Sequence, residues 1–274
     1  YSGIVKKVIH KSPSACATIT GNLGYFLHRG SEPDSIDKQL AKNLKSKIFF
    51  GNEVDFKNLK KDYDFIVVAS GNPSEANQLN IWNQTLKMCV KGSVITGDFE
   101  TDTFHVWLNK NYCKSGYAYL APFDKKRATL ALAVDEIEPN MMDRYWDEFL
   151  KTEKLDFNVT EYFYREHYSG FVYPHKVENI YFIGNAVGVL DPLLGFGVFP
   201  TVVTASAAAN SIVNGVDYEA EIKHAVGLNM KLLEFRKMFN KLNNKSYDFL
   251  IRLIGLPGVN SLIALIELGK NSKR

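Results

Sequence analysis

The pattern of apolar and polar positions along the chain predicts a mixed α/β protein. Residues 4–9 and 24–27 have strand composition, and residues 36–44 form a helix-like segment that Asp34 or Ser35 can cap. Residues 47–50 resemble a short strand, and residues 64–71 form a continuous apolar run that ends at a Gly-Asn-Pro turn. Such a run is typical of a strand buried on both faces.

The middle and the end of the chain show two further patterns. Short strand-like segments separated by turn signals indicate an antiparallel sheet, and they lie at residues 94–97, 103–108, 116–120 and 128–134. A helix is expected at 141–154 and a final strand at 180–183. The chain is then mostly helical, with expected helices at 197–214 and beyond 216 and short apolar helices at 249–251 and 262–266.

This order of elements predicts a nucleotide-binding α/β domain interrupted by a sheet domain. We expect residues 1–80 and 160–215 to form the first domain and residues 81–159 to form an antiparallel substrate domain. Residues 216–274 would then be a C-terminal helical region.

The composition is that of an ordinary globular protein and indicates no particular binding partner. The chain has 274 residues, 46% apolar and 23% charged, with a formal net charge of +3, and its charges of both signs are interspersed. This pattern gives no reason to expect nucleic acid, and no apolar run reaches membrane-spanning length. Three widely spaced cysteines without a C-x-x-C pair fit a reducing, cytoplasmic compartment and predict no metal site.

The segment Gly184–Gly197 is the most informative stretch of the sequence. It lies between an expected buried strand and an expected helix, and it is rich in glycine, which lets a flat ligand approach the main chain closely. The helix that begins near Gly197 would present free N–H groups and a positive dipole end to an anionic group. The same residues are also compatible with a tight strand-to-helix connection that binds nothing.

With its neighbours, this segment resembles the geranylgeranyl reductase family of FAD-dependent oxidoreductases, which have the para-hydroxybenzoate hydroxylase fold. The residues that carry the resemblance are 24–29 with 36–41, 64–71, 116–122 and 184–197. The resemblance implies a Rossmann-like FAD-binding domain with an inserted antiparallel substrate sheet and C-terminal helices. It also implies FAD as the cofactor, with NAD(P)H as a candidate electron donor.

The resemblance assigns roles to individual residues. On the cofactor side these are Arg29, Gly184, Asn185, Asp191, Pro192, Gly195, Gly197 and Val198. On the substrate side they are Tyr117, Tyr119 and Pro122. No catalytic residue follows from the sequence. Each assignment has a simpler alternative, because Arg29 can be a surface ion-pair residue, the tyrosines can be core aromatics, and Asp191-Pro192 can be a helix-capping turn.

Two features depart from the family pattern. The motif's aspartate is Asn185 here, and its amide can accept a hydroxyl proton but carries no charge. The three-glycine fingerprint that seats a pyrophosphate does not occur in the 274 residues. We therefore expect either that about 50–100 residues precede Tyr1 in the gene product or that FAD binding has been lost.

The function that the resemblance implies is a reductase that transfers a hydride from reduced flavin to a carbon–carbon double bond of an isoprenoid or other apolar substrate. The alternatives are a flavin-dependent monooxygenase on the same fold and a degenerate, non-catalytic protein that binds an apolar ligand. A lipid substrate would also bring peripheral contact with a membrane. The oligomeric state does not follow from the sequence.

Overall fold

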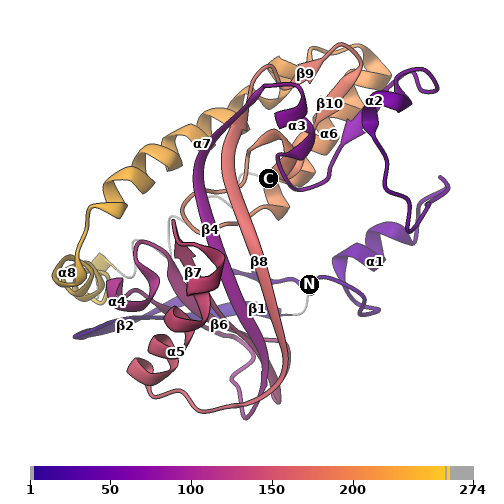
Figure 1. The fold of residues 1–274 in the computed structure, drawn as a ribbon. Coiled ribbons are helices and arrows are strands. Elements are labelled where there is room, and N and C mark those ends of the chain that lie inside the picture. The colour runs from indigo at the N-terminus through magenta and orange to yellow at the C-terminus, as the bar shows by residue number, and fades with distance from the viewer. Residues whose placement is uncertain (1–2, 257, 260–274) are drawn as a thin grey trace. The chain divides into compact units, whose positions relative to one another are not determined.

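The chain folds as two compact units, each built from several chain segments. The computed structural model describes residues 3–256 and 258–259. Unit 1 comprises residues 1–48, 88–165 and 242–274, and unit 2 comprises residues 49–87 and 166–241. Figure 1 shows the elements of both units.

Unit 1 is organised around a seven-stranded mixed sheet with the order β2-β1-β5-β6-β7-β4-β8. The strands are β1 (Gly3–Ser12), β2 (Ala15–Phe26), β4 (Trp82–Thr96), β5 (Thr103–Trp107), β6 (Tyr117–Pro122), β7 (Arg127–Asp135) and β8 (Asn158–Val172). Strand β1 pairs with β5 in parallel, whereas β1–β2, β5–β6, β6–β7 and β4–β7 pair antiparallel. The long strands β4 and β8 lie side by side and contribute residues to both units (Figure 1).

One face of this sheet packs against helices α4 (Lys110–Cys113) and α5 (Met142–Glu153). Inward-facing residues such as Trp107 and Leu132 meet Trp146 and Phe149 of α5, and all four are almost completely buried. Helix α8 (Asn244–Ile254) is tied to the β1–β2 hairpin, because Ser12 Oγ donates a hydrogen bond to Asp248 Oδ1 at 2.6 Å. The smaller elements of unit 1 are α1 (Ile36–Ala41) and the 3₁₀ turn η1 (Pro139–Met141).

Unit 2 has a three-stranded sheet and its own core. The sheet order is β3 (Ile66–Val68), β10 (Ile180–Phe182) and β9 (Lys176–Val177), with β3 parallel to β10. Its helical elements are α2 (Phe56–Leu59), α3 (Ser74–Gln78), the 3₁₀ turn η2 (Gly184–Val187), α6 (Val198–Asn214) and α7 (Tyr218–Asn240). The fully buried strand β10 lies at the centre of this core, against Ala208 of α6 and Ile222 of α7.

The expected fold class is confirmed, since the structure is a mixed α/β protein with a large sheet. Two strand predictions were wrong. Residues 47–50 form no strand, and Phe49 and Phe50 are exposed because no neighbouring strand pairs with them. The run at 64–71 yields only the three-residue strand β3, and its middle residue Val67 is exposed because β3 lies at the edge of its sheet.

The observed units divide the chain differently from the expected domain boundaries. Residues 1–48 group with the large sheet because β1 pairs with both β2 and β5. The α8 segment, expected in a separate C-terminal helical region, also groups with this sheet. The expected helix at 262–266 lies outside the described residues. Among the helices that the structure describes, none combines the length and apolarity needed to span a bilayer.

Candidate functional site: the β10–α6 connection

The segment from β10 to α6 begins at a strand that the core of unit 2 holds in place. Ile180, Tyr181 and Phe182 have at most 1% of their surface exposed. The buried Tyr218 hydroxyl at the start of α7 donates a 2.6 Å hydrogen bond to the carbonyl of Phe182. The chain therefore leaves β10 in a fixed direction and enters η2 at Gly184.

Packing within the protein explains two glycines of this segment. Gly184 has a φ of +58°, and a Cβ added there would lie 2.8 Å from Oγ1 of Thr201 on α6. Gly188 has a φ of +87°, and its Cβ would lie 2.5 Å from the carbonyl oxygen of Gly170 on β8. Both positions need glycine whether or not a ligand binds, because the neighbouring atoms and the left-handed backbone exclude a side chain.

The next residues form a closed turn of main chain. Oδ1 of Asp191 accepts a hydrogen bond from the Leu193 amide at 2.7 Å, and the Gly195 amide donates to the Asp191 carbonyl at 2.9 Å. The Asp191 amide donates in turn to the Phe196 carbonyl at 3.1 Å. Gly195 is exposed with a φ of +73°. Asp191 thus stabilises the turn itself, and Pro192 within it is buried.

Helix α6 begins directly after this turn, and no side chain caps it. Its N-cap residue is Gly197, and its first turn contains no acidic residue. The Thr201 amide donates to the Gly197 carbonyl at 3.0 Å and closes the first helical turn, while Phe196 and Phe199 beside it are more than half exposed. A 17-residue helix with an uncapped N-terminus presents a partial positive charge there.

The last part of this segment could accept a flat, anionic group, because its main chain is exposed at Gly195. Its first part could not, because neighbouring atoms of the protein fill the space beside Gly184 and Gly188. A Cβ on Gly197 would lie 2.8 Å from Oδ1 of Asn185, so the amide of Asn185 packs against the start of α6. The exposed main chain at Gly195, followed by the uncapped helix, is where a planar ring could approach. A flavin ring at this place stays a prediction.

Arg29 lies in unit 1, where it forms a bidentate ion pair. Its Nε and Nη2 donate to the two carboxylate oxygens of Asp37 at 2.9 and 3.0 Å, and the Gly30 amide donates to Oδ2 of the same carboxylate. The guanidinium holds the pKa of Asp37 below its usual range. The surface ion pair considered as the alternative for Arg29 is present, and a role at the cofactor stays a prediction.

The substrate-side tyrosines lie on the face of the large sheet that does not pack against α4 and α5. The rings of Tyr117 and Tyr119 on β6 are 6.0 Å apart between centroids, and Phe104 of β5 stacks on Tyr119 at 5.6 Å. Phe26 of β2 continues this aromatic row, with its ring 6.3 Å from that of Phe104. Burial raises the pKa of the Tyr119 hydroxyl, which therefore stays protonated at neutral pH.

Pro122 does not share this face. Strand residues alternate between the two faces, and in β6 the pattern of half-buried and buried residues places Pro122 with Ala118 and Leu120. The residues that sequence reasoning missed are Phe26 and Phe104. Strand pairing brings them beside the tyrosines. The only sequence signal for them was the alternation of side chains along β2 and β5, which places each of them on one face of its strand.

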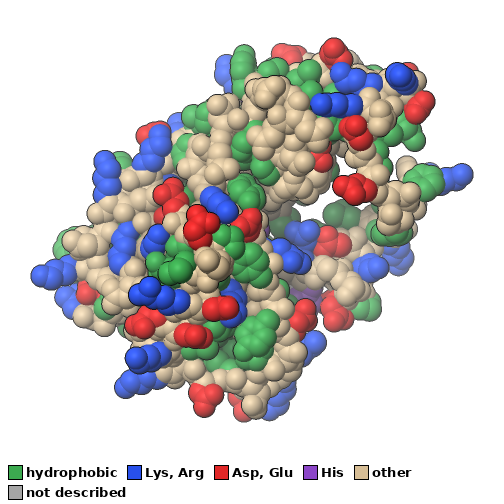
Figure 2. Space-filling view, viewed as in Figure 1, with side chains coloured by type: hydrophobic (Ala, Val, Ile, Leu, Met, Phe, Trp, Pro, Cys, Tyr) green, Lys and Arg blue, Asp and Glu red, His purple; other side chains and the backbone are tan. Residues whose placement is uncertain are grey.

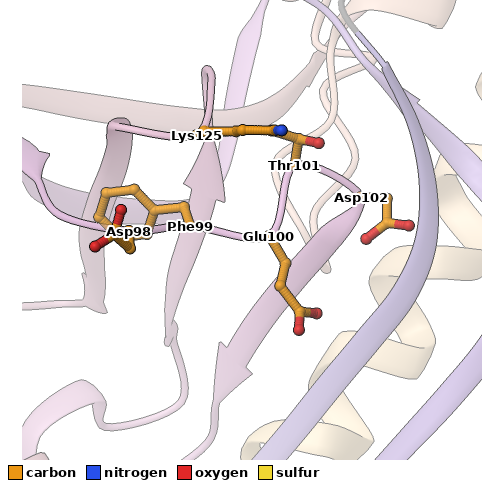
Figure 3. Close-up of a pocket in the computed structure, with 6 residues that line it drawn as sticks. All are labelled: Asp98, Phe99, Glu100, Thr101, Asp102 and Lys125. Atoms are coloured by element: carbon orange, nitrogen blue, oxygen red, sulfur yellow. The ribbon is translucent and has the colours of Figure 1, made fainter.

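Unit 1 also has a shallow depression. It has a volume of about 480 Å³ and is lined by residues 98–102 and Lys125 (Figure 3). Its acidic side chains are paired with lysines, Asp98 with Lys126 and Glu100 with Lys7. None of the expected site residues lines it. Figure 2 shows positive and negative side chains interspersed over the visible face of the molecule.

Comparison with known proteins identifies the fold. No model of a known protein family matches the chain. The digeranylgeranylglycerophospholipid reductase 2 of Methanothermobacter thermautotrophicus is 24% identical over 203 residues, which are 67% of this chain and 51% of that protein. The chain therefore spans about half the length of the curated relative that it matches.

Solved structures agree with this similarity. A geranylgeranyl bacteriochlorophyll reductase-like protein from Thermoplasma acidophilum superposes with a TM-score of 0.69 at 14% identity, covering 97% of this chain and 80% of the other. The resemblance to the geranylgeranyl reductase family is confirmed.

The fold is also similar to that of a flavin-dependent halogenase. The flavin-dependent halogenase CmlS superposes with a TM-score of 0.56 at 15% identity, over 85% of this chain and 50% of the halogenase. At such low identity these structures establish the fold, and the chemistry must be argued from the residues of this chain.

Proposed function

We propose that the chain is part of an FAD-dependent reductase that transfers a hydride from reduced flavin to a carbon–carbon double bond of an isoprenoid or other apolar substrate. The observation that carries this proposal is the turn at 191–197, which exposes main chain at Gly195 and leads into the uncapped helix α6. The resemblance assigns residues of this turn to the cofactor, and we propose that the flavin ring lies against it.

The chain's own residues supply binding and positioning. The backbone from Gly195 to Val198 would lie against the flavin ring, and the α6 N-terminus would favour negative charge on the reduced cofactor. Bound FAD would supply the hydride chemistry. Gly184, Asn185, Asp191 and Pro192 shape the segment that carries this surface. The resemblance also assigns Arg29 to the cofactor, and that role would compete with its pairing to Asp37.

The aromatic face of the large sheet supports an apolar substrate. Tyr117, Tyr119 and Phe104 form a continuous surface of rings, which suits a hydrocarbon chain better than a charged metabolite. The matched protein of Methanothermobacter thermautotrophicus is named digeranylgeranylglycerophospholipid reductase 2. We therefore propose a lipid-like substrate, a cytoplasmic enzyme that contacts the membrane peripherally, and NAD(P)H as the electron donor to be tested first.

Absorption spectroscopy of the purified intact gene product tests cofactor binding. We expect a yellow protein with the two absorption bands of oxidised flavin, either as purified or after incubation with FAD. After anaerobic reduction, adding a lipid with geranylgeranyl chains should restore the oxidised spectrum and yield, by mass spectrometry, a chain with one double bond fewer and two hydrogens more per flavin oxidised. A colourless protein that FAD cannot reconstitute would rule out the reductase and favour a non-catalytic ligand-binding protein, an alternative that the uncharged Asn185 also suggests.

A flavin-dependent monooxygenase or halogenase is the second candidate, because the fold is also similar to that of a flavin-dependent halogenase. Oxygen consumption separates the two classes. A reductase should reduce the double bond anaerobically, whereas a monooxygenase should consume oxygen in proportion to the substrate added.

A further inference from the structure

Two polar side chains of helix α7 bind the turn that follows β10. The Asn229 amide donates a hydrogen bond through Nδ2 to the Leu190 carbonyl at 2.8 Å. Arg236 donates through Nη1 to the Leu193 carbonyl at 3.2 Å. The two accepting carbonyls flank the Asp191-Pro192 pair, so α7 holds both ends of the first half of the turn.

The spacing of the two donors makes α7 a suitable support. Positions 229 and 236 are two helical turns apart and lie on the same stripe of the helix. Ile222, which anchors α7 in the core of unit 2, and the buried Leu233 lie close to this stripe. Because α7 is fixed in this way, its side chains can hold the main chain of the turn in one defined position.

Within the turn, the hydrogen bonds of Asp191 are local. Asp191 accepts from Leu193 and Gly195, and these contacts set the curvature of the turn but not its orientation toward α6. The contacts from Asn229 and Arg236 join residues 39 and 43 positions apart in sequence, and they restrain the orientation of the turn from outside it.

Arg236 also brings a charge to this place. Its side chain is 2% exposed, although arginine is among the residue types least often fully buried. The guanidinium carries a positive charge and lies at a turn that runs into the uncapped N-terminus of α6, whose partial charge is also positive. This combination favours an anionic group bound on the turn.

We propose that Asn229 and Arg236 are positioning residues that preset the turn 190–197 for the flavin, and that Arg236 in addition stabilises the anionic reduced form. This inference rests on the proposed function, because it assigns two further residues to the same site.

Hydrogen exchange of the protein without added flavin tests the positioning role independently of cofactor binding. Replacing Asn229→Leu removes one hydrogen bond, and the amides of residues 191–197 should then exchange about 3- to 10-fold faster. The matched control is Asn210→Leu on α6, which removes an amide hydrogen bond to Glu221 outside the turn. Unchanged exchange in Asn229→Leu, or equal acceleration of the turn in both variants, would overturn the positioning role.

Flavin affinity and reduction potential test the role of the charge. In Arg236→Met we expect FAD to bind roughly 10-fold more weakly and the reduction potential of the bound flavin to fall, whereas Arg236→Lys should restore most of the potential. The control Lys237→Met removes an exposed cation paired with Glu234.

The arms of the experiment separate the two proposals. A potential that is the same in wild type, Arg236→Met and Arg236→Lys would overturn the electrostatic role. If Arg236→Met does not fold, Arg236→Gln, which removes the charge but keeps a hydrogen-bond donor, takes its place in the comparison of potentials, and the exchange measurement on Asn229→Leu tests the positioning role separately. If no variant and not even the wild type binds FAD, the proposed function fails, while faster exchange in Asn229→Leu would still show that α7 positions the turn.

Discussion

Gly188 shows most directly how single residues shape the β10–α6 segment. Its φ of +87° is left-handed, and the carbonyl oxygen of Gly170 and the Cα of Phe171 lie 2.5 and 2.6 Å from the position of an added Cβ. These neighbours are backbone atoms of β8, which cannot rotate away as a side chain would. Gly215, at the end of α6, is also left-handed but has open space around it.

The two glycines allow backbone strain to be separated from steric exclusion. Replacing Gly215→Ala should cost about 1 kcal/mol of unfolding free energy, since only the left-handed conformation is penalised. Replacing Gly188→Ala should cost about 3 kcal/mol or more because β8 must also move. Urea unfolding of both variants measures the difference, and equal costs would show that the Gly188–β8 contact is not tight.

At the scale of elements, β8 is the least expected part of the fold. It has 15 residues, and most of those between Asn158 and His167 are exposed, as befits a strand at the edge of the large sheet. Phe163 anchors it, because the tip of its ring lies where a Cβ on Gly92 of β4 would be, only 2.1 Å from that position. An aromatic ring over a glycine of a neighbouring strand is a known way to stabilise sheet pairing.

The Gly92–Phe163 contact predicts that the effect of Gly92→Ala on the free energy of unfolding changes sign when Phe163 is also replaced. Replacing Gly92→Ala in the wild type should displace the ring and destabilise the protein by about 1–3 kcal/mol. In a Phe163→Ala background the same replacement should stabilise it by roughly 0.5 kcal/mol, because glycine is unfavourable inside a strand. Thermal or urea unfolding of the four proteins tests this, and a destabilising Gly92→Ala in both backgrounds would contradict it.

For the molecule as a whole, two histidines of the large sheet make the free energy of unfolding depend on pH. Burial lowers the pKa of His10 on β1, whose Nδ1 is buried without a hydrogen-bond partner among the described residues. Burial, aided by Lys11, lowers the pKa of His105 on β5. Both side chains are therefore neutral in the folded protein over a wider pH range than in the unfolded chain.

The consequence is a loss of stability on mild acidification. As the pH falls through the ordinary histidine pKa of about 6.5, the unfolded chain takes up protons that the folded protein does not, so unfolding becomes easier. The urea midpoint should fall between about pH 7.5 and pH 5.5, and the double variant His10→Gln with His105→Gln should show a smaller fall. The exposed His224→Gln serves as the control. The carboxylates with lowered pKa, such as Asp37 and Glu100, act at lower pH and do not interfere.

The sequence by itself determined the features that depend on local pattern. The helices at 142–153 and 198–214 and the strands β5, β6, β7 and β10 follow from periodicity and turn residues. The β10–α6 connection and its resemblance to the geranylgeranyl reductase family also follow from a contiguous motif. These features are local because each is set by residues that are neighbours in the chain.

Only the tertiary structure decided what depends on distant pairing. The placement of β1 and β2 in the large sheet, the edge strand β8 and the aromatic row from Phe26 to Tyr117 arise from pairing between strands far apart in sequence. The same is true of the glycines whose Cβ positions are filled by Thr201 and Gly170, and of the hold that Asn229 and Arg236 have on the turn. No local pattern specifies such contacts, because they form only when burial of the two cores brings the segments together.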